Sequence, residues 1–187
     1  EWELREKSQK DSLTGLLNNS TIKQQIGARL QSLKRGQTGY LVVQDVDSFK
    51  KINDTNGHLF GDAVLCSFAD ELSNIFPEAL KGRIGGDEFV FYVEDMDREQ
   101  LEEKLKQLNR CMSDRYDDDK TGLHISCSLG AAVTDGTVTD YNLLFQWADA
   151  ALYQVKSKGK GAYYLLDVKE GVALPGKSYL DSEENKE

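Results

Sequence analysis

Several features are scarce in this chain of 187 residues, and each scarcity excludes a class of protein. It has no run of about 18 apolar residues, so we expect no membrane-spanning helix and no membrane contact by this segment. No signal peptide is visible at its start. Its three cysteines, Cys66, Cys111 and Cys127, show no paired spacing, which argues against a disulfide framework and suits a reducing, cytoplasmic location.

Positive charge is also scarce, because 32 Asp and Glu residues outnumber 23 Lys and Arg residues, which gives a formal net charge of -9. This balance argues against a broad basic face that binds nucleic acid. An anionic ligand must instead be met at a local site, where metal ions screen the like charges. The length suits one domain with short tails. Since the chain begins with Glu1 rather than Met, we expect a segment of a longer protein, whose missing sequence leaves room for a membrane anchor.

Hydrophobic periodicity alternates between helical and strand patterns along the chain. Apolar stripes that follow capping residues predict helices at 20–35, 60–76, 98–116 and 141–155. Apolar runs and strict alternation predict strands at 40–46, 89–93, 125–133 and 163–166. Helices interleaved with strands and with a hairpin indicate an α+β or mixed α/β domain.

The segment RIGGDEFVFYV at 83–93 organises the rest of the chain. Its second half is an aromatic and β-branched run that predicts a buried strand, and Gly85-Gly86 predicts a hairpin turn before it. Asp87 and Glu88 are therefore expected at the turn of a hairpin rather than on a helix. The turn is either a plain type I′ turn kept soluble by its acidic residues or a place where a bulky ligand approaches the backbone.

A second acidic strand end favours the ligand-binding alternative. The apolar run 40–46 leads into Asp45-Val46-Asp47, and alternation along a strand points the two carboxylates the same way. An acidic strand end beside an acidic hairpin suits hard divalent cations such as magnesium. For Asp47 we favour a role as the cap of the helix that follows, a role that Ser48 could take instead.

Together these segments resemble the GGDEF family, the diguanylate cyclases. Besides GGDEF at 85–89, the family's motifs are matched by DSLTGL at 11–16, DVDSFK at 45–50, the pairs ND, GH and GD at 53–62, and ADAALY with its following lysines at 148–160. Each motif alone is a weak signal, but their order and spacing are specific. The resemblance implies an α/β (α+β) fold, with a palm-like, ferredoxin-related central sheet flanked by helices and the hairpin at the active site.

The resemblance also implies a reaction, in which two GTP molecules are condensed into cyclic di-GMP and two pyrophosphates by attack of a 3′-hydroxyl on the α-phosphate. It implies two magnesium or manganese ions per active site, held by Asp45, Asp87 and the backbone carbonyl of Val46. Glu88 would be either a further ligand or a helper in deprotonating the hydroxyl. Because each domain holds one GTP, the product requires a homodimer, controlled by an upstream sensor domain.

The substrate-binding residues implied by the resemblance are Ser48, Phe49, Lys50, Asn53, Asp62, Lys156 and Lys160. The first three offer backbone N–H groups and a positive helix end to phosphates. The two lysines contact phosphates, and their i,i+4 spacing points them the same way if the helix persists that far. Asn53 and Asp62 stand at the family's guanine-reading positions.

The implied organisation is the end of a signalling helix at 1–10, the catalytic domain at 11–167 and a polar tail at 168–187. A charged run at 114–120 is expected to be a solvated loop. The alternative to an active enzyme is a catalytically degenerate module that binds GTP or cyclic di-GMP. A cyclase with relaxed base choice is disfavoured by Asp62.

Many members of the family carry an inhibitory R-x-x-D site five residues before the Gly-Gly pair. Here that window reads FPEA at 76–79, so Phe76 replaces the arginine and Ala79 replaces the aspartate. Phe76 closes an apolar helical stripe and is better explained as core. We therefore expect no inhibitory site.

Overall fold

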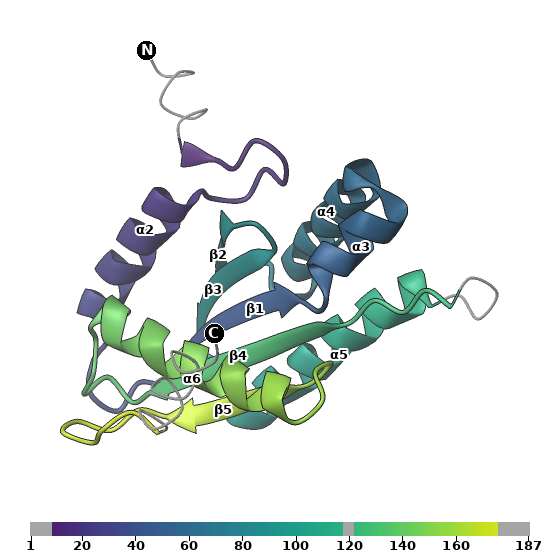
Figure 1. Cartoon of the computed structure of the whole chain (residues 1–187). Coiled ribbons are helices and arrows are strands. Elements are labelled where there is room, and N and C mark those ends of the chain that lie inside the picture. Colours follow the sequence, from purple (N-terminus) through teal and green to yellow (C-terminus); the bar gives the residue numbers. More distant parts are fainter. Residues whose placement is uncertain (1–8, 118–121, 176–187) are drawn as a thin grey trace, which may run out of the picture.

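A five-stranded sheet with the order β2-β3-β1-β4-β5 forms the centre of the computed structural model, which describes residues 9–117 and 122–175 (Figure 1). The strands are β1 (Gly39–Val46), β2 (Leu80–Gly85), β3 (Glu88–Glu94), β4 (Cys127–Thr134) and β5 (Tyr163–Asp167). The helices are α2 (Asn19–Ser32), α3 (Phe49–Asn56), α4 (His58–Ile75), α5 (Arg98–Tyr116) and α6 (Tyr141–Ser157). The expected α+β class is confirmed.

Strand β1 is the central strand, because it pairs antiparallel with both β3 and β4. It is buried at every position. Since side chains alternate along a strand, Tyr40 and Val42 pack in a core with α4 and α5, whereas Leu41 and Val43 pack in a second core with α2 and α6. Helices on both faces explain why this strand reads as one continuous apolar run.

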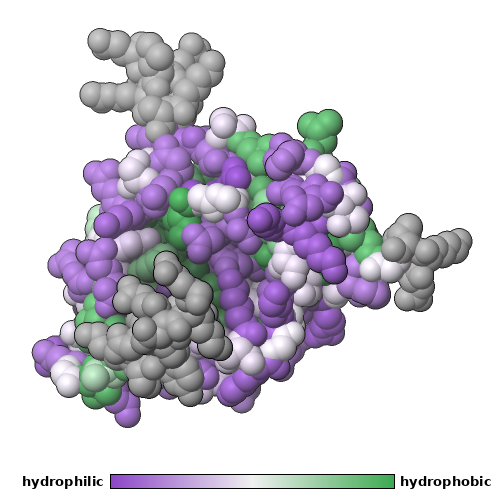
Figure 2. All heavy atoms as spheres, in the orientation of Figure 1, coloured by the Kyte–Doolittle hydropathy of each residue, from purple (hydrophilic) through white to green (hydrophobic). Residues whose placement is uncertain are grey.

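Helices α2, α5 and α6 begin at capping residues that the sequence predicted. The side chain of Asn18 accepts a hydrogen bond from the Thr21 amide at the start of α2. Asp97 and Gln100 form a capping box at the start of α5, and Asp140 caps α6. None of the helices in the described part of the chain is both long enough and apolar enough to cross a membrane. In Figure 2 hydrophilic residues dominate the visible face, and most hydrophobic residues there are recessed between them.

Parts of the expected organisation lie outside the described residues. These are most of the signalling-helix segment at 1–10, much of the charged run at 114–120, and the tail beyond residue 175. At the expected end of the domain, Val168 is buried and its amide donates to the carbonyl of Val133. The chain is therefore still attached to the sheet at this residue.

The acidic hairpin differs in detail from its prediction. Its two-residue turn is Gly86-Asp87, since Gly85 pairs with Glu88 across the strands. Gly86 has a φ of 48°, but Asp87 has no positive φ, whereas a type I′ turn needs positive φ at both central residues. The type I′ alternative is therefore wrong, and Glu88 is the first residue of β3 rather than part of the turn.

Arg83 joins the hairpin turn to the loop at 11–16. Its Nε donates to the carbonyl of Gly86 at 2.9 Å, and its Nη1 donates to both carboxylate oxygens of Asp11 at 3.2 and 3.3 Å. Asp11 also accepts hydrogen bonds from the amide and hydroxyl of Thr14. Burial opposes ionisation of Asp11, but the bonds from Thr14 and the charge of Arg83 lower its pKa. The DSLTGL motif thus holds the acidic turn in place.

Close packing between α6 and β4 predicts that Gly130 tolerates no side chain. A Cβ there would lie 2.2 Å from the carbonyl oxygen of Ala148 and 2.2 Å from the amide nitrogen of Leu152, which are backbone atoms. We expect Gly130→Ala to lower the free energy of unfolding by roughly 3 kcal/mol, measured by urea denaturation. The matched control is Gly27→Ala in α2, where no atom lies within 4 Å of the new Cβ. It should stabilise the protein by about 0.5–1 kcal/mol, and equal effects of the two changes would contradict this packing.

The bonds of Arg83 predict that the acidic turn depends on this side chain for its rigidity. Arg83→Met should accelerate amide hydrogen exchange at residues 85–88 by about tenfold, because charge-assisted hydrogen bonds are lost. Exchange in β1 should not change. Arg98→Met is the control, since Arg98 pairs with Glu102 and Asp167 instead. Unchanged exchange at the turn in Arg83→Met would show that Arg83 does not position it.

Candidate active site

Three carboxylates converge where β1 ends beside the hairpin. Asp45 lies directly opposite Glu88 in the β1–β3 register, and Asp87 precedes Glu88 in the turn. Burial and the charge of Asp45 raise the pKa of Asp87. Partial loss of hydration and the charge of Asp45 raise the pKa of Glu88 in the same way. The structure therefore brings together the three acidic residues that the sequence singled out.

Lys156 on α6 forms an ion pair with Asp45, through its Nζ and the Oδ2 atom. The Asp45 side chain is 8% exposed and that of Lys156 is 39% exposed. Burial disfavours the charged lysine, but the hydrogen bond to Asp45 and the charges of Asp45 and Asp87 raise its pKa. The other oxygen of Asp45, Oδ1, is buried without a hydrogen-bond partner in the described part of the chain. Lys156 thus contacts a carboxylate where a phosphate contact was predicted.

Asp47 has a structural role that the sequence did not predict. Its carboxylate accepts hydrogen bonds from the hydroxyls of Ser126 and Ser128, both at 2.6 Å, and from the amide of Gly161 at 3.0 Å. It does not cap α3. The residue before that helix, Ser48, has a left-handed φ of 55°, and no described side chain caps the helix start. Both capping hypotheses are therefore wrong, because distant partners on β4 and after α6 take up the Asp47 oxygens.

The two lysines at the end of α6 point to different places. The helix ends at Ser157, and Lys160 has a φ of 66°, so the helix does not continue to Lys160 as the i,i+4 argument required. This turn carries Lys160 to the start of α3, where its Nζ donates to the hydroxyl of Ser48 at 3.2 Å. The positive end of α3, with Phe49 and Lys50, therefore lies beside a lysine, as a phosphate site requires.

Asn53 and Asp62 lie where α3 and α4 come close together. A Cβ on Gly61 would lie only 1.8 Å from the Oδ1 of Asn53, so α4 leaves room for this amide by having a glycine there. That Oδ1 is buried without a hydrogen-bond partner among the described residues. Asp62 is the next residue of α4. A buried amide oxygen without a partner suits a ligand that donates a hydrogen bond.

Asp149 lies within the ADAALY motif, but no role was predicted for it from the sequence. It precedes Lys156 by seven residues in α6, which places both on the same face of that helix. Asp149 is exposed, yet the protein atoms around it and the charge of Asp45 raise its pKa, while Lys156 opposes that rise. Asp149 is thus a fourth carboxylate close to the site.

The acidic residues of the site offer oxygen ligands to a divalent cation. Hard oxygen donors are present in Asp45, Asp87 and the Val46 carbonyl, and the unpartnered Oδ1 of Asp45 lacks the compensation that a buried carboxylate oxygen needs. As they stand, the described His, Cys, Asp and Glu side chains form no cluster of three tight enough to hold a metal. The oxygen ligands therefore suit a divalent cation, although Lys156 is bonded to one of them, the Oδ2 of Asp45.

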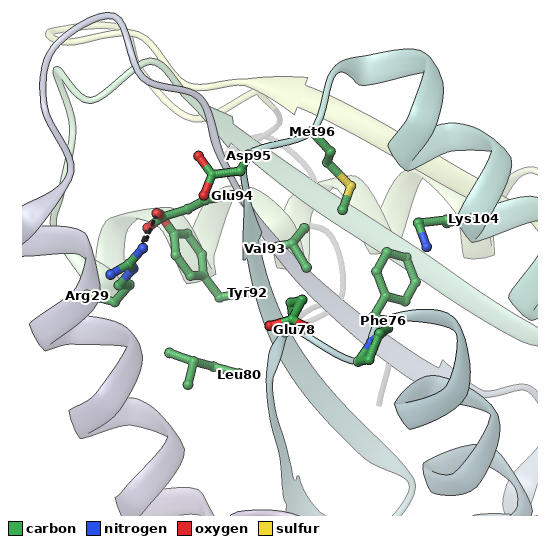
Figure 3. A pocket seen from close by; sticks show the side chains of 12 residues that line it. Arg29, Phe76, Glu78, Leu80, Tyr92, Val93, Glu94, Asp95, Met96 and Lys104 are labelled. Carbon is green, nitrogen blue, oxygen red and sulfur yellow. Dashed lines mark hydrogen bonds and ion pairs between the residues drawn. The ribbon is translucent and has the colours of Figure 1, made fainter.

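The inhibitory-site window at 76–79 lines a pocket, in which Figure 3 shows the side chains of Phe76 and Glu78. Phe76 is 2% exposed and stacks against Phe91 at 4.9 Å between ring centroids, so the prediction that it belongs to the core is confirmed. The Lys81 ammonium donates to the carbonyls of Phe76, Pro77 and Ala79. Lys104 donates to the Ile75 carbonyl at 2.7 Å and lies over the Phe76 ring.

Comparisons with known proteins identify the family of this chain. The sequence model of the family described as "Diguanylate cyclase, GGDEF domain" matches residues 8–162. The diguanylate cyclase DgcS of Shewanella oneidensis is 35% identical over 159 residues, which are 83% of this chain and 52% of DgcS. The cyclic di-GMP phosphodiesterase PdeR of Escherichia coli is 30% identical over 154 residues, which are 82% of this chain and 23% of PdeR. This chain therefore spans about half or less of these two curated relatives.

Among solved structures, the chain is similar to the coiled coil and GGDEF domain of DgcB from Caulobacter crescentus in complex with c-di-GMP. That match has a TM-score of 0.80 and 25% identity, and it covers 88% of this chain and 89% of the other. The fold and the sequence pattern thus lead to the same conclusion. This chain belongs to the GGDEF family of diguanylate cyclase domains.

Proposed function

We propose that this domain condenses two GTP molecules into cyclic di-GMP and two pyrophosphates as the output domain of a longer signalling protein. The observation that carries the proposal is the convergence of Asp45, Asp87 and Glu88 at the end of β1. Family membership supports it. In the reaction, a bond forms between a 3′-oxygen and the α-phosphorus of the other GTP. The bond between the α-phosphorus and the bridging oxygen breaks, and pyrophosphate leaves with that oxygen.

The residues of this chain divide the work of binding. The start of α3, at Ser48, Phe49 and Lys50, holds phosphates through its free N–H groups, and Lys160 adds a positive charge at the same place. Asn53 and Asp62 hydrogen-bond the edge of guanine. The unpartnered Oδ1 of Asn53 suits a guanine N–H donor.

The acidic residues account for the chemistry. Asp45, Asp87 and the Val46 carbonyl would hold two Mg²⁺ or Mn²⁺ ions per site. When bound, such ions stabilise negative charge on the attacking and leaving oxygens. Glu88 either adds a ligand or accepts the proton of the 3′-hydroxyl.

The reaction needs two copies of the domain. One set of guanine-reading and phosphate-binding residues per chain holds one GTP, so two active sites must face each other in a homodimer. Upstream sensor sequence in the longer protein would set their distance. The cell compartment for this reaction is the cytoplasm, where GTP is found.

A binding module without turnover is the second candidate. Its supporting observation is the Lys156–Asp45 ion pair, which occupies an oxygen that the cation requires. The relative PdeR carries the name of a phosphodiesterase rather than a cyclase, so similarity over this segment accompanies more than one activity. In this case the domain would bind GTP or cyclic di-GMP and regulate a neighbouring domain.

The enzyme proposal predicts that Asp87→Asn abolishes product formation while the fold survives. Loss of one negative charge unbalances a site for divalent ions, and we expect a fall of at least about 100-fold in the rate. Chromatography of the nucleotides formed from GTP and Mg²⁺ measures the rate, and circular dichroism checks the fold. Asp70→Asn, an exposed change on α4, is the control. Undiminished synthesis in folded Asp87→Asn protein would refute the assignment.

The inhibitory-site window predicts that cyclic di-GMP does not bind tightly outside the active site. Phe76 is core, and the Lys81 ammonium is already bonded to backbone carbonyls, so neither can grip a phosphate. Calorimetric titration of cyclic di-GMP, with the active site filled by a non-hydrolysable GTP analogue, measures this. We expect no heat of binding at micromolar concentrations. Tight binding that persists beside the analogue would show that another surface serves as an inhibitory site.

A further inference from the structure

We propose that Lys156 acts as a counter-ion within the metal site. Its ammonium pairs with the Asp45 carboxylate until a divalent ion binds there and displaces the ammonium. The inference rests on the metal site of the proposed function and adds a step that precedes the reaction. It assigns Lys156 two successive partners, the Asp45 carboxylate first and the triphosphate afterwards. Cation entry and triphosphate binding then become linked events.

Negative charge is concentrated at the end of β1. Asp45 is nearly buried, and Asp87 and Glu88 lie close enough for the charge of Asp45 to raise the pKa of each. Like charges gathered in a partly buried place repel one another and are costly without compensation. Among the described residues, Lys156 is the cation bonded to Asp45. It supplies the compensation that the divalent ions would supply in the loaded site.

The two cations require the same atom. The Lys156 ammonium contacts the Oδ2 of Asp45, and the Oδ1 of the same carboxylate is buried and unpartnered. A divalent ion could begin to bind at the free Oδ1, but full use of the carboxylate requires the ammonium to leave Oδ2. With the ion pair in place, no three His, Cys, Asp or Glu side chains among the described residues lie close enough together to hold a metal.

Other negatively charged partners are within the surroundings of Lys156 if its ammonium leaves Asp45. Its side chain is 39% exposed, and it carries a compact charge on a flexible stem. Asp149 lies on the same face of α6 and interacts electrostatically with Lys156. The start of α3, the proposed phosphate site, is close in the chain to the present partner of Lys156, because Asp45 precedes Ser48 by only three residues. The freed ammonium therefore moves from a carboxylate to a phosphate, and by linkage each ligand favours the binding of the other.

The first test measures Mn²⁺ binding without nucleotide, by the electron paramagnetic resonance signal of free Mn²⁺. Lys156→Met removes the competing cation and should tighten Mn²⁺ binding by about tenfold, because Mn²⁺ then no longer has to displace the ammonium from Asp45. Lys156→Arg keeps a cation there and should not tighten binding. The control is Lys158→Met, which removes an equal charge from a lysine that lies over the Tyr164 ring. It should leave the affinity within about twofold of the unchanged protein.

The outcomes separate this inference from the proposed function. If the unchanged protein binds Mn²⁺ saturably and Lys156→Met binds it with the same affinity, the counter-ion role is wrong and the metal site stands. If Lys158→Met tightens binding as much as Lys156→Met, net charge explains the effect and the inference is also wrong. If none of these proteins binds Mn²⁺ saturably, the metal site itself is wrong, and the inference is wrong with it.

A second measurement follows the lysine directly. In protein labelled with ¹³C-lysine, Mg²⁺ without nucleotide should shift the Cε signal of Lys156, identified by its absence in Lys156→Met. The signal of Lys158 should stay unchanged. A Lys156 signal that does not respond while Mn²⁺ binding is saturable would show that the ammonium keeps its place and does not compete with the metal.

Discussion

The structure depends on one constraint, which is that a carboxylate is held nearly buried at the end of a strand covered by helices on both faces. A carboxylate in such a place is costly unless a cation compensates its charge, and Lys156 pairs with it. The strand cannot shift to expose it, since a register slip would turn the apolar side chains of β1 away from both cores. The surrounding features follow from this. The hairpin brings Asp87 and Glu88 to the same place, and α6 brings Lys156.

The supports of the site are hydrogen bonds that join distant parts of the chain. Arg83 holds the acidic turn against Asp11, so the segment at the start of the domain contacts the hairpin directly. Asp47 holds β4 and the turn after α6 against the end of β1, which sets the position of Lys160. The loop at 11–16 and the acidic turn are therefore joined directly through one side chain.

Much of the fold was predictable from local signals. Three helices were predicted from the apolar stripes that follow the caps Asn18, Asp97 and Asp140. The hairpin was predicted from the Gly-Gly pair and the apolar run after it. The role of Asp47 was not predictable, because its partners Ser126 and Ser128 lie about 80 residues away in the chain. The same holds for Lys156, whose contact with Asp45 is decided by how α6 crosses the sheet. Gly61 was visible in a motif, but its contact with Asn53 appears only when α3 meets α4.

The central claim is that two copies of this acidic site act together on two molecules of GTP. The most direct measurement incubates the protein with GTP and Mg²⁺ over a wide range of protein concentration and identifies the nucleotide product by mass spectrometry. The account predicts cyclic di-GMP with two pyrophosphates per product, formed at a rate per protein molecule that rises with protein concentration until dimers are saturated. Recovery of unreacted GTP at every concentration, from protein that binds GTP and is fully folded, would contradict it.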